Sequence, residues 1–209
     1  MLGIHDYWLF VATGVLLNLT PGQDTFYILG RSVAQGTRIG VASALGIGAG
    51  SLAHTAMAAV GLSALLAASA YAFTVVKLVG AAYLVYLGVR MLAAPSADQR
   101  LTSGTYAGSA LTAFRDGALT NILNPKVALF FLALMPQFID PASDAKVLAF
   151  VVLGLTFVTT GTLWCLVLAL GAGRLRDFFV RHPKRMSVVS RAAGGLFVVL
   201  GVHLAVSRQ

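Results

Sequence analysis

The stretch Asn18-Leu19-Thr20-Pro21-Gly22-Gln23-Asp24 interrupts the first long apolar run of the chain near its middle. A second stretch, Asn121-Ile122-Leu123-Asn124-Pro125-Lys126, interrupts a later apolar run in the same way. Proline lacks a backbone N–H and clashes with the preceding turn, so each stretch predicts a break in a helix. Irregular backbone at mid-bilayer depth is tolerated only inside the protein or along a watery cavity. The two breaks therefore predict an internal cavity.

Composition places these apolar runs in a membrane. Of the 209 residues, 58% are hydrophobic and 11% are charged, whereas a soluble domain carries about a quarter charged residues. This composition excludes an ordinary soluble fold and a disordered chain. A helix needs about 20 residues to cross the bilayer core. We therefore expect six spans, over Tyr7–Val33, Ile39–Leu66, Ala70–Leu92, Leu111–Ile139, Val147–Leu170 and Val188–Val206.

The distribution of basic residues predicts how the chain sits in the membrane. Eleven Lys and Arg residues follow the first, third and fifth spans, and only Lys146 and Arg208 lie on the opposite side. Because basic loops stay in the cytoplasm, both termini are expected outside it. The net charge of +8, including the basic cluster Arg174–Arg185, is then interpreted as a topology determinant beside anionic lipid. We accordingly expect no nucleic-acid partner.

An internal repeat relates the two halves of the chain. The pentapeptide Val85-Tyr86-Leu87-Gly88-Val89 of the third span matches Val198-Val199-Leu200-Gly201-Val202 of the sixth, 113 residues later, and the two proline breaks also match. Because each half has an odd number of spans, the halves must enter the membrane from opposite sides. The predicted fold is an all-α integral membrane protein with six transmembrane helices in a 3+3 inverted repeat, an architecture of secondary transporters. Its parts are residues 1–92, a cytoplasmic connector over 93–110, and residues 111–209.

The residues at each break predict how the helix restarts. In Thr20-Pro21-Gly22-Gln23, the threonine is expected to cap the new helix, with the proline at the first helical position and the glutamine completing a capping box. In Asn124-Pro125, the asparagine is expected to cap the later restart. Both restarts would direct free N–H groups and a positive dipole end into the cavity, which suits a carboxylate. A proline kink that only helps helices to pack is the alternative.

Charged and amide side chains flank both breaks. Asp24 and Lys126 follow equivalent breaks with opposite signs, and each would cost at least about 2.5 kcal/mol at a helix centre unless compensated. Asp24 would bind a substrate ammonium group or a proton, while Lys126 would hold a carboxylate or clamp Asp24 in a mutual ion pair. A purely structural ion pair is the alternative. Asn18 and Asn121, one turn before each break, would bind the freed carbonyls or the ligand.

A column of small residues in the second span indicates packing more than chemistry. Ala42, Gly46, Gly50 and His54 recur at four-residue spacing, which allows close helix approach and would also suit a homodimer. The other histidines are too scattered to suggest a metal site, and we expect no cofactor. Ser51 and His54 would be the nucleophile and base of an intramembrane hydrolase, but no G-x-S-x-G elbow accompanies them. We therefore expect no enzyme.

Four further residues are chemically distinctive. Lys77 is expected to snorkel toward the outer face. The pair Arg115-Asp116 begins the fourth span at the cytoplasmic face and is expected to form a local interfacial salt bridge, with a gate pair as the alternative. Cys165 is the single cysteine, which excludes an intrachain disulfide.

Several motifs, in order along most of the chain, resemble the LysE/RhtB family of amino-acid exporters. They are Asn18–Asp24, the glycines from Gly36 to Gly50, Lys77–Gly88, Gly117, Asn124–Phe131, Pro136-Gln137-Phe138 and Gly194–Ala205. The family pattern reads TPGPD, K-x-x-G-x-x-Y-L-x-Y-L-G and N-P-K-x-x-x-F-F…P-Q-F. The chain departs from it at Gln23, where the family usually has proline, and Asp24 is left in place.

The resemblance implies a bacterial inner-membrane efflux carrier for amino acids or close analogues, of the homoserine, threonine or lysine type, driven by the proton-motive force. Together with the breaks, it leads us to expect alternating access. The carboxylate of a zwitterion would lie near the restarts and Lys126, and its ammonium group near Asp24, until protonation of Asp24 displaces it. A passive channel and an exporter of metal ions or other small solutes are the alternatives.

Overall fold

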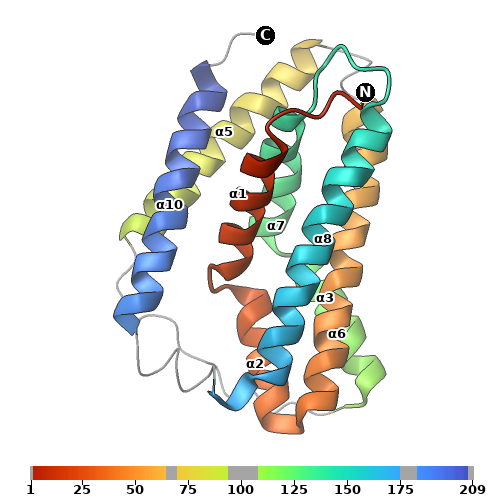
Figure 1. Ribbon diagram of the computed structural model, residues 1–209, viewed down its shortest axis with the longest axis vertical. Helices are drawn as coiled ribbons and strands as arrows, with labels where there is room; N and C mark the ends of the chain where they lie inside the picture. Colours follow the sequence, from red (N-terminus) through yellow and green to blue (C-terminus); the bar gives the residue numbers. More distant parts are fainter. Residues whose placement is uncertain (1, 65–69, 94–107, 175–182, 207–209) are drawn as a thin grey trace.

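The computed structural model describes residues 2–64, 70–93, 108–174 and 183–206 (Figure 1). Most of the predicted connector and of the basic cluster Arg174–Arg185 lies outside these ranges, and so does the side chain of Lys77. Apart from one isolated antiparallel bridge between Ile4 and Ile139, the regular structure in the described ranges is helical. The helices are α1 (Tyr7–Leu19), α2 (Gln23–Gln35), α3 (Thr37–Met57), the π-helical η1 (Ala58–Leu62), α5 (Ala70–Ala93), α6 (Ala110–Ile122), α7 (Pro125–Leu129), the π-helical η2 (Phe130–Leu134), the 3₁₀-helical η3 (Met135–Phe138), α8 (Lys146–Leu170) and α10 (Pro183–Val206).

Both predicted breaks are present, and the helices have the character expected of a membrane protein. Two helical segments, Thr37–Leu62 and Lys146–Leu170, are long and apolar enough to cross a bilayer by themselves. A third span is formed if Ala110–Ile122 and Pro125–Phe138, which meet at an angle of 48°, are counted as one broken helix. The remaining apolar helices are shorter. The all-helical membrane class is thus confirmed, while the count of six spans and the 3+3 repeat remain predictions.

The broken helices lie in the middle of the bundle. Figure 1 shows α5 and α10 together on one side, α3, α6 and α8 on the other, and α1 and α7 between them. The packing agrees, because α1 contacts α8 and α10 while α5 contacts α7 and η2. Helix α2, below the first break, packs on α3, α6 and α8. Both breaks are therefore surrounded by other helices, as irregular backbone in a membrane requires.

Small residues bring α3 and α6 into close contact. A Cβ atom on Gly46 would overlap the backbone carbonyl of Phe114, and one on Gly50 would lie 2.7 Å from the Ala118 carbonyl oxygen. From the other side, a Cβ atom on Gly117 would lie 2.6 Å from the carbonyl oxygen of α3 residue Ser43. The column that the sequence offered as a homodimer surface is therefore covered by α6 of the same chain. That interpretation was wrong because the pattern specifies close approach, not the identity of the approaching helix.

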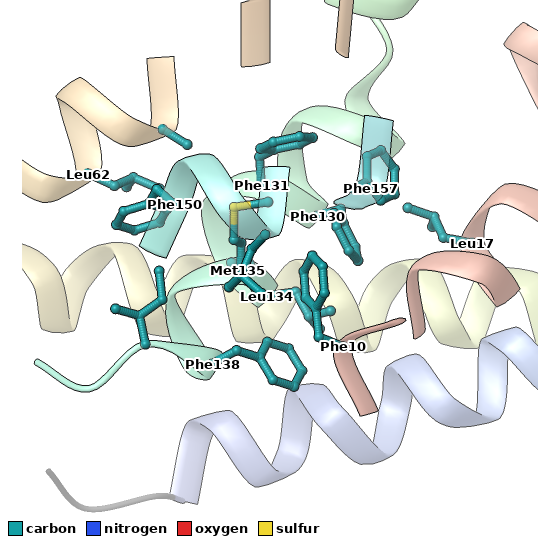
Figure 2. Packing of buried hydrophobic residues seen from close by; sticks show 14 of the residues in the cluster. Phe10, Leu17, Leu62, Phe130, Phe131, Leu134, Met135, Phe138, Phe150 and Phe157 are labelled. Atoms are coloured by element: carbon teal, nitrogen blue, oxygen red, sulfur yellow. The ribbon is translucent and has the colours of Figure 1, made fainter. Parts of the chain in front are cut away.

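Two apolar cores lie on opposite sides of the breaks. The larger core gathers aromatic rings from α1, η2, η3 and α8 (Figure 2). It lies toward the end where the N-terminal segment is hydrogen-bonded to η3. Phe130 and Phe157 are stacked with 4.5 Å between ring centroids, and Phe10 meets Phe138 edge to face with 5.3 Å between centroids. The smaller core joins α2, α3 and α8 around Ile28. The breaks thus lie between an aromatic core and an aliphatic core.

Candidate functional site

At the first break, α1 is closed by its own last residues. Thr20 is the C-cap of α1, and its hydroxyl donates a hydrogen bond of 2.7 Å to the Leu16 carbonyl. Gly22 is the N-cap of α2 and gives no side-chain cap. The predicted role of Thr20 as N-cap, with Pro21 at the first helical position and Gln23 closing a capping box, was therefore wrong. A threonine hydroxyl can bond either the carbonyl four residues before it or the amide groups after it, and here it bonds the former.

The second break has the predicted cap. The Asn124 side-chain oxygen accepts a hydrogen bond of 3.0 Å from the Lys126 backbone N–H, and Pro125 occupies the first position of α7. The missing N–H of Pro125 costs nothing there, because the first N–H groups of a helix have no partner within it. With these boundaries, Asp24 and Lys126 are each the second residue of a restarted helix. Two opposite charges thus occupy equivalent positions.

Lys126 binds the end of α1. Its ammonium group donates hydrogen bonds to the carbonyl oxygens of Leu17 at 3.2 Å and Thr20 at 3.0 Å. These belong to the carbonyls that lose their helical partners where α1 stops, and a cation there also balances the negative end of the helix dipole. A Cβ atom on Gly22 would lie 3.1 Å from the ammonium nitrogen. The glycine therefore gives the lysine room to reach this position.

Asp24 binds the end of α6. Its Oδ2 atom accepts a hydrogen bond of 2.9 Å from the side-chain amide of Asn121, which is 1% exposed. The Asn121 side-chain oxygen in turn accepts one of 3.1 Å from Ser51, and the His54 ring lies 3.2 Å from the Asn121 carbonyl oxygen. The same histidine stacks on Phe131, with 5.5 Å between ring centroids. Asn121 therefore joins α2, α3 and α6 at one point.

The two charges are arranged crosswise and not as a pair. Asp24, in the restart of the first broken span, reaches α6, whereas Lys126, in the restart of the other, reaches α1. Among the described residues, Asp24 and Lys126 do not form the mutual ion pair considered from the sequence; the ion pairs found there are His5–Asp6 and Arg31–Asp116. The lysine is instead bound by backbone carbonyls, which sequence patterns do not display.

A small cavity lies where these groups converge. Its volume is about 30 Å³, and α1, α2, α3, α6, α7 and α8 all contribute to its wall. This is room for about two water molecules and too little for an amino acid. Of the residues predicted to bind the substrate or a proton, Asn18, Asp24, Asn121 and Lys126 line the cavity. The others, which shape the two breaks without lining it, are Thr20, Pro21, Gly22, Asn124 and Pro125.

Helix α8 completes the wall with residues that sequence reasoning missed. Gly161, Thr162 and Trp164 line the cavity, and a Cβ atom on Gly161 would lie 3.3 Å from the Asn18 side-chain amide. The glycine therefore allows α1 and α8 to approach beside the first break. These residues lie in a continuous apolar run without a break or a charge. The signal available in the sequence was the presence of a small residue, Gly161, and a polar residue, Thr162, within one helical turn of Trp164.

A polar seam joins α2 to α6 on the side of the cavity away from the aromatic core. The Arg31 guanidinium donates hydrogen bonds to the side chains of Asp116 at 2.5 Å and Gln35 at 2.8 Å. The Tyr27 hydroxyl donates one of 2.9 Å to the Ala113 carbonyl. Arg31 is buried, with 3% exposure. The expected local pairing of Asp116 with its neighbour was therefore wrong, because the partner comes from another span. We call the contacts among these residues the α2–α6 seam.

The hydrolase alternative finds no support in the geometry. Ser51 donates its hydrogen bond to the Asn121 side chain, and His54 contacts the Asn121 backbone. The serine and the histidine are not hydrogen-bonded to each other within the described residues, although a nucleophile needs its base in reach. The described part of the chain also contains no group of three or more histidine, cysteine or acidic side chains arranged to hold a metal ion.

Comparisons with known proteins cover nearly the whole chain. The chain is 34% identical to an uncharacterized membrane protein of Vibrio cholerae, over 98% of both chains. It is 32% identical to the homoserine/homoserine lactone efflux protein of Salmonella typhimurium, over 98% of both chains. A leucine efflux protein of Salmonella choleraesuis is 27% identical, over 97% of this chain and 96% of its own. No solved structure matches.

The family model of the LysE type translocator matches residues 15–208. The match begins within α1 and includes both breaks and every residue described above as lining the cavity. With the relatives that align over almost their full lengths, it establishes that the chain belongs to the LysE type translocator family.

Proposed function

We propose that this protein exports amino acids from the bacterial cytoplasm across the inner membrane, by alternating access around its two breaks and in exchange for protons. The observation that carries the proposal is the crosswise binding of Asp24 and Lys126 around a small internal cavity. An acidic and a basic group in one intramembrane cavity suit a zwitterion, and such charges are costly unless they serve a function. Two relatives are named as homoserine and leucine efflux proteins, which supports an amino acid as the substrate.

The inverted repeat is proposed on positions related by 113 residues. Gly48 of α3 and Gly161 of α8 stand at this separation, and both line the cavity. Gly88 of α5 and Gly201 of α10 stand at it too, and both lie where α5 crosses α10, with added Cβ atoms 2.5 Å and 2.9 Å from the opposite backbone. A twofold relation through the cavity would produce both coincidences. The same relation would make the two breaks equivalent at a shorter separation, because Pro21 and Pro125 are 104 residues apart.

Two closures separate the proposed site from the two sides of the membrane. The α2–α6 seam lies on the side where the basic residues Arg38 and Arg115 are found, which the positive-inside rule assigns to the cytoplasm, with both termini outside. The aromatic core lies on the opposite, outer side. Export would begin when the seam opens and end when the aromatic core parts. The present conformation, with a cavity of only about 30 Å³ between the seam and the aromatic core, would be an intermediate between the inward-facing and outward-facing states.

Asp24 is the proposed proton acceptor because it lines the cavity and is hydrogen-bonded to α6. As a carboxylate, it accepts the Asn121 hydrogen bond that ties α2 to α6. Hydrogen bonds to ionised acceptors are roughly twice as strong as those between neutral groups. A proton that arrived from outside would therefore release a bound ammonium group and weaken this tie in one step. The protonated, substrate-free carrier would then return toward the cytoplasm, where Asp24 would release the proton before the next amino acid binds.

The proposal is tested by uptake of radiolabelled amino acids into everted membrane vesicles energised to be acidic inside. We expect accumulation of a class of amino acids, abolished by an uncoupler and by Asp24→Asn. Equilibration without concentration would instead indicate a passive channel. Vesicles that contain the folded protein and take up no amino acid would contradict the proposal. Ser109→Ala, which removes the exposed N-cap of α6, is a matched control for a single polar substitution and should leave accumulation intact.

A further inference from the structure

We infer that Trp164 and Asn18 bind the carboxylate of the transported amino acid through neutral N–H donors, while Asp24 receives its ammonium group. The inference rests on the proposed amino-acid export and gives the substrate an orientation in the cavity. It assigns the carboxylate to donors of α1 and α8, and not to the restarted helices or to Lys126.

Three polar atoms in the cavity wall carry the inference. The indole Nε1 of Trp164, the amide Nδ2 of Asn18 and the carboxylate Oδ1 of Asp24 are all buried without a hydrogen-bond partner, and all three residues line the cavity. The great majority of buried polar side-chain atoms in proteins have a partner. Two unused donors and one unused anionic acceptor around one cavity are complementary to a carboxylate and an ammonium group.

The two donors are neighbours, and the acceptor comes from another helix. Gly161 precedes Trp164 by three residues on α8, so that both lie on one face of the helix. The Asn18 amide lies against Gly161, 3.3 Å from where its Cβ would be. Asn18 and Trp164 therefore border the same part of the cavity wall. Asp24, in the first turn of α2, is tied to α6 by Asn121 through its other oxygen, so only Oδ1 remains for a ligand.

The positions favoured by the sequence are already used. Two of the three donors of the Lys126 ammonium bind α1 carbonyls. The α2 N-terminus carries Asp24, whose charge would repel a carboxylate. At the other restart, the Asn124 side chain accepts the Lys126 backbone N–H. Among the cavity-lining side chains of the described ranges, Trp164 and Asn18 carry the fully buried N–H donors that have no hydrogen-bond partner.

This arrangement makes selection depend on both charged groups of the substrate. An amine without a carboxylate would meet Asp24 but leave the indole and amide donors unused. A carboxylic acid without an amine would meet those donors but leave Asp24 unpaired. The site should therefore favour α-amino acids over the amines and acids derived from them. Trp164→Phe should therefore weaken binding of the amino acid and leave binding of the matching amine unchanged.

The test is equilibrium competition against a radiolabelled amino acid on the purified full-length protein. The probes are two pairs, each of an amino acid and the amine that lacks only its carboxylate. They are L-homoserine with 3-aminopropan-1-ol, and L-leucine with 3-methylbutan-1-amine. We expect Trp164→Phe to weaken binding of the amino acid about tenfold, since a hydrogen bond to a charged group contributes at least about 1.5 kcal/mol. Binding of the matching amine should stay within about twofold, well below the tenfold step of 1.4 kcal/mol. Asn18→Ala should show the same selectivity, and it carries the test if Trp164→Phe does not fold.

Trp8→Phe is the matched control, because it removes an indole that is 78% exposed and outside the cavity. The control also leaves Trp164 as the single tryptophan, whose emission should shift with L-homoserine or L-leucine and not with the amines. Equal weakening of amino acid and amine in Trp164→Phe and Asn18→Ala, or no weakening, would overturn the inference while export stands. If the wild-type protein binds neither amino acid and its vesicles accumulate none, the proposed function fails and the inference fails with it.

Discussion

Replacing Lys126 with methionine removes the ammonium group from the end of α1 while keeping an apolar stem of similar length. Two hydrogen bonds to carbonyls, of 3.2 Å and 3.0 Å, are lost with it. A hydrogen bond to a charged group contributes about 1.5–3 kcal/mol, so the lower limit for both is about 3 kcal/mol. At about 2–4 °C per kcal/mol for a chain of this size, the melting temperature should fall by about 6–12 °C.

The assay is thermal unfolding of the purified protein in detergent, followed by circular dichroism. Lys146→Met is the matched control, because Lys146 makes one hydrogen bond, to the Ser143 carbonyl beside the start of α8. Its loss should cost about 1.5 kcal/mol, half of the lower limit for Lys126. The double variant Asp24→Asn/Lys126→Met decides between capping and pairing. If Lys126 mainly neutralised Asp24, removing both charges would restore the stability. Full restoration, or a melting temperature unchanged in Lys126→Met, would refute the capping role.

Three further changes probe the close helix contact, the seam and the serine. Gly50→Ala places a Cβ atom 2.7 Å from the Ala118 carbonyl oxygen and should lower the free energy of unfolding by about 1–3 kcal/mol. The control Gly195→Ala, whose Cβ would meet nothing within 4 Å, should not destabilise the protein. Equal melting temperatures for the two variants would contradict the close packing of α3 against α6. Asp116→Asn weakens the α2–α6 seam, so impermeant thiol reagents should label Cys165, the single cysteine, about fivefold faster in everted vesicles. A fivefold change corresponds to about 1 kcal/mol on an equilibrium. The neighbouring Arg115→Gln is the control, and an equal labelling rate in both variants would argue against a gate. Ser51→Ala loses one neutral hydrogen bond to Asn121, worth about 1 kcal/mol, so transport should persist with a modest rise in KM. If the protein instead hydrolysed a labelled ester and Ser51→Ala abolished that turnover, the result would support the hydrolase alternative.

Much of the site could be predicted because its main features are local in sequence. Proline at mid-span sets a break wherever it occurs, and an asparagine directly before it is a strong cap, so the second restart formed as expected. Asn18, Asp24, Asn121 and Lys126 could be grouped because they flank matched breaks, and all four line one cavity. Charged residues and proline breaks are easily recognised within apolar sequence.

The errors arose where a side chain had two partners within reach. Thr20 can bond the carbonyl behind it or the amides ahead of it, and the distant Lys126 ammonium on the Thr20 carbonyl helps to fix the end of α1. Asp116 had an arginine beside it in sequence, but the buried Arg31 of another span is its partner. Trp164 was missed because an indole in an apolar run looks like any core residue, and only the packing of α1 against α8 brings it to the same cavity as Asn18.

Labelling of Cys165 from each side of the membrane tests alternating access most directly. This thiol is 7% exposed, lines the cavity and is the single cysteine of the chain. With a charged, membrane-impermeant methanethiosulfonate, the account predicts labelling in everted vesicles and also in right-side-out vesicles, with the balance moved by a proton gradient and both reactions slowed by the exported amino acid. Labelling confined to one side under every gradient, or insensitive to that amino acid, would contradict a cavity that opens alternately between the two breaks.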